Sequence, residues 1–306
     1  MTQTNKNIFF FFMVLAMAGW GASWVNAKVL SSYINEYEMM FLRNFFTIIT
    51  LAPILVITRK YFYTNKKSLF LAFLAAIVMI VYLKYYFLGV KFGTASLGGA
   101  LVTSLIPINT FILMALFFGK KLQNKDIFAL ILGILGVLTI LSIWTYSFDQ
   151  IFTEHNIYFL IASVLWPIFT IISSKSTKTS PLVFSFYMYV FMTILLLIFF
   201  VEPMKLPYES FDSIFWINIL CVAVVSTTFA TSIYFIGIEK LGTNEVSSFI
   251  FLVPFFAISF SIIFLNEKVS ISIIIGTIMT LIAVKILNNI KIFKKKEKNC
   301  TKNIKN

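Results

Sequence analysis

Ten long apolar runs, separated by short polar connections, cover almost the whole chain. A helix that crosses a bilayer needs about 20 mostly apolar residues, and a run of more than about 18 is a candidate span. The ten runs lie near residues 8–27, 38–58, 69–88, 95–118, 126–145, 156–173, 182–201, 213–236, 244–265 and 270–290. The connections leave no room for a separate soluble domain, so the runs predict a protein embedded in a membrane.

We expect the runs to be helices rather than strands. Transmembrane strands alternate apolar and polar residues over about ten positions, whereas the stretch SLFLAFLAAIVMIVYL at 68–83 does not alternate. Charged residues make up 12% of the chain, against roughly 25% in a soluble domain. The first run is longer than a signal-peptide core, so we interpret it as a helix too. The predicted fold class is an all-α integral membrane protein with ten transmembrane helices.

The distribution of lysine and arginine predicts how the chain is oriented. With the N-terminus in the cytoplasm, eighteen of these residues lie in cytoplasmic loops and ends and four in outer loops. Because basic residues favour the cytoplasmic side, we expect both termini inside and a multi-pass location in the cell (inner) membrane. The tail at 291–306 is expected to be a basic cytoplasmic segment near anionic headgroups. The net charge of +13 therefore indicates a lipid bilayer as partner, and no nucleic acid.

Two parts of the sequence repeat at a spacing of nearly 150 residues. The phrase YYFLGVKFGT at 85–94 returns as IYFIGIEKLGT at 233–243, and Pro107 is matched by Pro254, 147 residues later. The chain thus divides into a first repeat at 1–150 and a second at 151–290, each with five runs. Because five is odd, the second repeat enters the membrane from the opposite side. Inverted repeats of this kind are typical of secondary transporters, whose two halves open in turn to either side.

Four motifs resemble the drug/metabolite transporter superfamily, specifically its EamA-like branch. They are AGWGASWVNAK at 18–28, Arg43, GTASLGGALVTSLIPI at 93–108 and FLVPFFAISFSIIFLNEKVS at 251–270. The resemblance covers roughly residues 6–290. It implies a ten-helix carrier of small metabolites, among them amino acids and related compounds. The acidic end of the fourth motif, Glu267, has no equivalent in the first repeat.

Candidate substrate-binding residues lie in three groups. In the run at 95–118, Thr103 and Pro107 share one helical face, and Ser247 and Pro254 occupy the matching face of the run at 244–265. Small residues usually serve helix packing, but a proline frees a backbone carbonyl that should face protein or a watery cavity.

The second group is charged. Arg43 and Lys84 lie about one turn inside their runs, and charge at depth is costly. Arg43 could pair with Glu36 or Glu38, and Lys84 could snorkel to the surface. If both face a cavity, the site suits a carboxylate or another anionic group. Lys285, near the inner end of the last run, is expected to snorkel.

The third group is aromatic and amide. Trp20, Tyr86, Trp166 and Tyr234, together with Trp24 and Tyr187, could form a cage around an apolar or cationic part of a small-molecule substrate. Asn26 is a further polar candidate. Aromatic residues are also common at membrane interfaces, so both interpretations stay open.

The sequence also lacks several kinds of site. No Asp or Glu lies in the middle of a run, although proton-coupled carriers commonly use such groups. We therefore expect a facilitator or exchanger, or coupling through Glu245 and Glu267 at helix ends. No catalytic triad, phosphate loop or metal cluster appears, so an enzyme is not expected, and no cofactor. Two cysteines are too few for a disulfide framework. A multidrug exporter and a non-transporting receptor remain as alternatives, and a complete repeat is consistent with a monomer.

Overall fold

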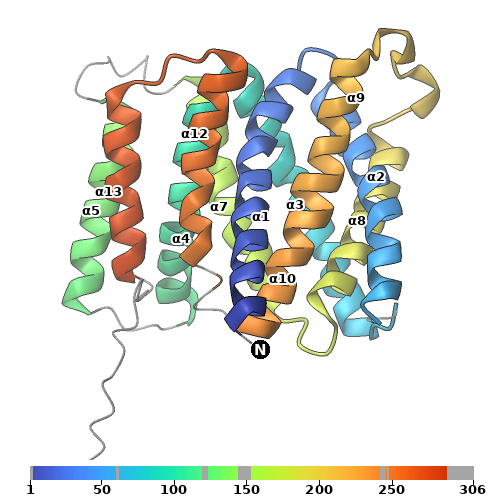
Figure 1. Cartoon of the computed structure of the whole chain (residues 1–306), viewed down its shortest axis with the longest axis horizontal. Helices are drawn as coiled ribbons and strands as arrows, with labels where there is room; N and C mark the ends of the chain where they lie inside the picture. The colour runs from blue at the N-terminus through green and yellow to red at the C-terminus, as the bar shows by residue number, and fades with distance from the viewer. Residues whose placement is uncertain are drawn as a thin grey trace, which may run out of the picture.

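The computed structural model describes residues 3–59, 62–118, 123–143, 153–241, 246 and 248–287. Within these ranges all regular structure is helical, and the helices run roughly parallel to one another along one direction (Figure 1). The first repeat contains α1 (Gln3–Leu30), α2 (Glu36–Ile57), α3 (Lys66–Phe92), α4 (Ala95–Phe118) and α5 (Asn124–Ile140). The second contains α7 (Glu154–Ser174), α8 (Pro181–Phe199), α9 (Ser213–Leu220), α10 (Ala230–Leu241), α12 (Leu252–Leu265) and α13 (Ile271–Leu287).

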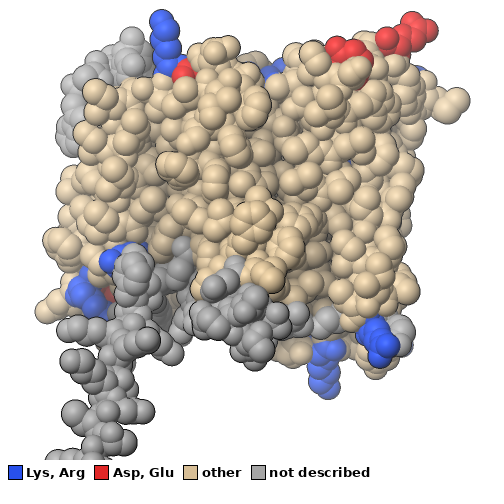
Figure 2. Space-filling view, in the orientation of Figure 1, with Lys and Arg blue, Asp and Glu red and all other residues tan. Residues whose placement is uncertain are grey.

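Over the described residues, each of the ten predicted runs overlaps a helix or helices joined end to end. Seven of these are long and apolar enough to cross a membrane: α1, α2, α3, α4, α7, α8 and the continuous helix from Ser213. Within the described part, α5, α12 and α13 reach only 17, 14 and 17 residues. On the face shown in Figure 2, charged side chains gather at the two ends and leave an uncharged band between them.

The continuous helix that begins at Ser213 has an unusual middle section. Between α9 and α10, the segment η3 (Cys221–Phe229) is a π-helix. The hydroxyls of Thr227 and Thr228 donate to backbone carbonyls five residues earlier, at 2.8 and 3.0 Å. The hydroxyl of Ser226 donates to the Gly19 carbonyl of α1 at 2.5 Å. Side-chain hydroxyls therefore hold this wider turn both internally and against α1.

The most extensive helix contacts join one repeat to the other. They pair α5 with α13, α3 with α7, α1 with α12, α4 with α7 and α12, and α8 with α2 and α3. Glycine allows the closest approach: a Cβ placed on Gly276 of α13 would lie 2.5 Å from the carbonyl oxygen of Gly136 of α5. Helices of the two repeats thus pack directly against one another.

The two prolines of the repeat lie at different positions in their helices. The predicted run at 244–265 contains a 3₁₀ turn, η4 (Ser248–Phe251), that leads directly into α12 at Leu252. Pro254 is the third residue of α12, whereas Pro107 lies in the interior of α4. That each proline frees a backbone carbonyl toward protein or a watery cavity stays a prediction.

Candidate functional site

Arg43 lies deeper in the protein than its sequence position suggested. The helix α2 begins at Glu36 because Asn35 forms a capping box: its side chain accepts the N–H groups of Tyr37 and Glu38, and its own N–H donates to the Glu38 carboxylate at 2.9 Å. Arg43 therefore lies seven residues, about two turns, inside α2, not one turn. Its side chain is only 8% exposed, and the cap already engages Glu38.

The Arg43 guanidinium has no carboxylate partner among the described residues. Its Nη2 donates to the side-chain oxygen of Asn44 at 3.3 Å, and its guanidinium carbon lies 6.0 Å from the centre of the Tyr189 ring. Tyr82 and Tyr86 are the other ionisable groups close enough to interact with its charge. In the described structure, the Arg43 Nε and the Asn44 Nδ2 are buried without a hydrogen-bond partner. A lone cation thus lies among phenol rings.

Aromatic side chains from both repeats form a chain of ring contacts next to this cation. Trp24 lies 4.4 Å from Tyr86 and 6.2 Å from Phe159, measured between ring centres. Tyr82 lies 6.0 Å from Tyr86 and 5.1 Å from Trp166. We call the following set the Arg43 cluster: Trp24 of α1, Arg43 and Asn44 of α2, Tyr82 and Tyr86 of α3, Trp166 of α7 and Tyr189 of α8. Of the residues singled out in the sequence, it brings together Trp24, Arg43, Tyr86 and Trp166.

The structure places the other aromatic candidates outside this cluster. Trp20 and Tyr234 pair with each other at 5.1 Å, in a separate core region between α1 and α10. The Tyr187 hydroxyl donates to the Phe62 carbonyl at 2.8 Å, at the opposite end of the bundle from Glu36. The single predicted cage is therefore two groups of rings, because α1 presents Trp20 and Trp24 to different neighbours.

The polar candidates also lie apart. The Lys84 ammonium lies 5.8 Å from the centre of the Tyr37 ring, near the start of α2. Asn26 is 8% exposed and lies beside Cys221, a free cysteine. Thr103 donates its hydroxyl to the Gly99 carbonyl within α4. Ser247 lies outside the described residues, as do Glu245 and Cys300.

Glu267 joins the two repeats at the upper end of the bundle as drawn in Figure 1. It follows α12, and its carboxylate accepts the backbone N–H groups of Ala95 and Ser96 at 2.8 and 2.9 Å. These are the first two residues of α4, where unpaired N–H groups and the helix dipole favour an anion. The sequence singled out Glu267, but its role became visible only in the fold.

Lys28 of α1 completes this upper connection. Its Nζ donates to three carbonyl oxygens at the end of α3, those of Val90, Lys91 and Gly93, at 2.9, 2.9 and 2.6 Å. A cation at the C-terminal end of a helix complements its unpaired carbonyl groups. Together, Lys28 and Glu267 bind the two helix ends that flank the Gly93-Thr94 turn; we call these contacts the upper latch.

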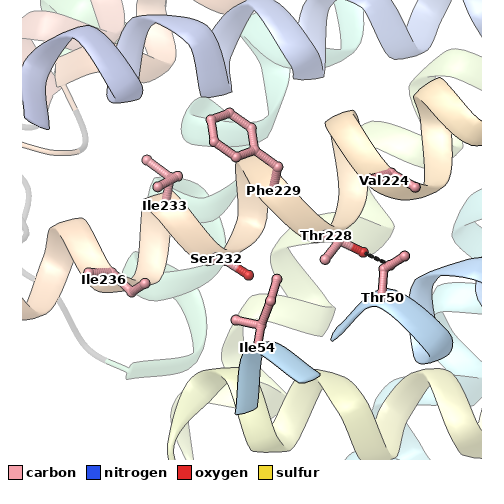
Figure 3. Close-up of a pocket in the computed structure, with 8 residues that line it drawn as sticks. All are labelled: Thr50, Ile54, Val224, Thr228, Phe229, Ser232, Ile233 and Ile236. Carbon is pink, nitrogen blue, oxygen red and sulfur yellow. Dashed lines mark hydrogen bonds between the residues drawn. The ribbon is translucent and has the colours of Figure 1, made fainter. Parts of the chain in front are cut away.

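Two cavities flank the π-helical segment and not the Arg43 cluster. The larger, of about 320 Å³, is shown in Figure 3 and lies between α2 and the η3–α10 helix. Apart from Thr50, Thr228 and Ser232 its lining is apolar, and the first two share a hydrogen bond of 2.7 Å. The second, of about 270 Å³, lies on the α1 side and shares Phe229 with the first. None of the candidate residues from the sequence lines either cavity. The buried guanidinium of Arg43 and the unpartnered N–H donors of Arg43 and Asn44 lie in the Arg43 cluster, so we take this cluster as the candidate site.

Known proteins show a consistent likeness to this chain. Residues 7–142 and 155–289 each match the EamA-like transporter family. An "Uncharacterized transporter YoaV" of Bacillus subtilis (strain 168) is 24% identical over 266 residues, covering 85% of this chain and 89% of that protein. An "Uncharacterized transporter" of Archaeoglobus fulgidus is 24% identical over 288 residues, covering 89% and 94%.

A solved structure titled only "Crystal structure of protein" has the same fold, with a TM-score of 0.62 and 13% identity over 92% of this chain and 96% of that one. The two family matches together span most of the chain. In the part of the chain that the structure describes, seven helices are long and apolar enough to span a membrane. The chain is therefore a multi-pass membrane protein that belongs to the EamA-like transporter family.

Proposed function

We propose that this protein is a secondary transporter that exports or exchanges amino acids or related small metabolites by alternating access. The observation that carries the proposal is the pattern of contacts between the repeats. If α1–α5 are related in chain order to α7, α8, α9–α10, α12 and α13, then the contact of α1 with α12 corresponds to that of α7 with α4. The contacts of α3 with α7 and α8 correspond likewise to those of η3 with α1 and α2.

This correspondence supports two halves that are related by a two-fold axis, and the odd number of five spans in each half makes the proposed repeat an inverted one. Three further contacts, α2 with α8, α4 with α12 and α5 with α13, map onto themselves, as they should across a two-fold axis. Two such halves can exchange their arrangements, so that a site between them opens first to one side and then to the other. The Arg43 cluster draws its residues from both halves, which is where a shared site is expected. An enzyme has no need of this symmetry.

The orientation follows from charge and is part of the proposal. We place both termini and the basic tail in the cytoplasm, so that the upper latch lies on the outer side of the cell membrane. Single cysteines introduced in the tail and beside Glu267, in a Cys221→Ala, Cys300→Ala background, would be labelled in intact cells by an impermeant maleimide. Labelling of the tail but not of the position beside Glu267 would contradict this orientation.

Counterflow tests transport directly. Purified protein in liposomes preloaded with one unlabelled amino acid should take up the same labelled amino acid transiently and in a saturable manner. Uptake that never saturates would indicate a channel instead. Binding without exchange would indicate a receptor, and exchange of lipophilic cations but not amino acids would favour a multidrug exporter. Arg43 argues against that last alternative, since a buried cation repels a cationic cargo.

We propose that transport is either not coupled to protons or is coupled through acidic groups at helix ends. Among the described residues Glu267 serves as a helix cap, and Asp126 forms a capping box at the start of α5. Neither is a mid-span relay of the kind that pumps use. Transport that still follows an imposed pH gradient when Glu245 and Glu267 are both changed to glutamine would overturn this interpretation.

A further inference from the structure

Arg43 is a buried charge without a counter-ion in the described structure. Removing a guanidinium from water is costly, and the loss is normally offset by a carboxylate or a full set of acceptors. Here the cation has one acceptor, the side-chain oxygen of Asn44, at 3.3 Å, and its guanidinium carbon lies 6.0 Å from the centre of the Tyr189 ring. Arginine within a membrane span that lacks a protein partner marks a place where something else supplies the negative charge.

The unsatisfied atoms in this cluster are donors. The Arg43 Nε and the Asn44 Nδ2 are both buried and lack partners in the described structure. Both are N–H groups, so the missing group must accept hydrogen bonds. The fork of a guanidinium matches the two oxygens of a carboxylate in geometry as well as in charge. A single cation also matches a single negative charge, whereas a phosphate dianion would call for a second cation, and Lys84 lies over Tyr37 instead.

The aromatic side chains of the cluster indicate the chemistry of the rest of the ligand. Trp24, Tyr82, Tyr86 and Trp166 form a chain of ring contacts at 4.4 to 6.0 Å, and two of these rings, Tyr82 and Tyr86, lie near enough to interact with the Arg43 charge. No aspartate or glutamate of the described chain interacts with Arg43, so the cluster offers no strong partner for an ammonium group. The ligand is therefore defined by its carboxylate and its apolar body.

We propose that the Arg43 cluster binds the carboxylate of a monocarboxylic solute with an aromatic or branched aliphatic body, and that an amino group is not required. That this solute is the transported cargo rests on the proposed transport function. That the cluster binds it does not depend on transport. Arg43 holds the carboxylate, Asn44 donates a further hydrogen bond, and the rings enclose the body.

Matched pairs of ligands test the charge requirement. Calorimetric titration of the full-length protein in detergent would compare phenylpropionate with phenylethylamine, isocaproate with isoamylamine, and indolepropionate with tryptamine. At least one carboxylate should bind at least tenfold more tightly than its amine. Inorganic phosphate and chloride should not compete with it. If no carboxylate binds more tightly than its amine, or if phosphate displaces it, the inference is wrong.

Variants then test whether Arg43 is the group responsible. Arg43→Gln should weaken binding of the preferred carboxylate by about 30-fold or more, as expected for loss of one partner of a buried charge pair. Arg43→Lys keeps the positive charge but loses the paired N–H donors of the guanidinium. Its affinity for the carboxylate should therefore lie between those of the native protein and of Arg43→Gln. The control Lys285→Gln removes a cation exposed on α13 and should change the affinity less than twofold.

Since Arg43 has no counter-ion among the described residues, Arg43→Gln should unfold at the same temperature as the native protein or higher. Native-like binding by Arg43→Gln would refute the assignment; if that variant does not fold, native-like binding by Arg43→Lys would refute the need for the fork.

The same variants separate this inference from the transport proposal. If the protein binds the carboxylate through Arg43 yet catalyses no counterflow of it, transport fails and the anion site stands. If counterflow occurs and is unchanged in Arg43→Gln, transport stands and the anion site fails.

Discussion

Replacing Glu267 with glutamine should destabilise the protein by loosening the upper latch. The carboxylate accepts two backbone N–H groups at the start of α4, at 2.8 and 2.9 Å. A hydrogen bond to a charged group contributes about 1.5–3 kcal/mol when fully formed, and an anion at a helix N-terminus adds about 0.3–1 kcal/mol. Glutamine keeps one acceptor oxygen and loses the charge. Because the site is only partly buried, we expect a loss of about 1.5–3 kcal/mol in the free energy of unfolding.

Thermal unfolding in a mild detergent, followed by the circular dichroism of the helices, measures this loss. The midpoint of Glu267→Gln should fall by about 5 °C, and Glu267→Ala, which leaves both N–H groups without an acceptor, should fall further. The neighbouring Lys268→Gln is the control, because Lys268 is exposed and should change the midpoint by less than about 1 °C. If Glu267→Gln has the same midpoint of unfolding as Lys268→Gln, the cap does not stabilise the protein and the reasoning is refuted.

Three further changes probe other parts of the molecule. Gly276→Val places a side chain 2.5 Å from a carbonyl of α5 and should cost about 3 kcal/mol or fail to fold, while Ile274→Val on the exposed face should unfold almost as the native protein does. Thr50→Val and Thr228→Val, separately and together, should show a coupling of about 0.5–1.5 kcal/mol across their 2.7 Å hydrogen bond; additive effects on the free energy of unfolding would exclude it. The N–H groups that Asp212 caps, above all that of Phe215, hold the pKa of its carboxyl below the usual range, so its stabilising effect is present above about pH 4 and disappears as the pH falls through the lowered value. Asp212→Asn should therefore lower the unfolding temperature at pH 7 and make no difference near pH 2.

The positions of the helices could be predicted because apolar length is a local property. The run predicted at 95–118 coincides with α4, and the others differ by a few residues at their ends. The depth of Arg43 in its helix was predicted less well: the capping box of Asn35 starts α2 two residues before the apolar run, so Arg43 lies about half a turn further inside the helix than the run alone indicates. The π-helix was missed altogether, although a pair of threonines able to bond to carbonyls five residues back is a signal for it.

The candidate site could be predicted only in part, because it depends on how helices cross. Arg43, Tyr86 and Trp166 belong to different helices, yet charge and aromatic character alone selected all three. Tyr82 and Tyr189 were not selected, since only the packing of α3 and α8 against α2 brings them to the guanidinium. Glu267 and Ala95 lie 172 residues apart in sequence, and a single sequence gives no measure of such a pairing.

The π-helical segment has a consequence for how the length of this chain can vary. A π-turn holds one residue more than an α-turn would, so η3 carries a residue that the helix could lose without ceasing to be a helix. Deleting one residue between Cys221 and Phe229 would return the segment to α-helical turns, while α9 and α10 keep nearly the same register. Tyr234 would then stay close to its present 5.1 Å from Trp20. The same deletion within α10 would instead rotate everything beyond it by about 100° and draw it back by about 1.5 Å. The π-helical segment is therefore the place where this helix can lose a residue with the least disturbance to its packing against α1.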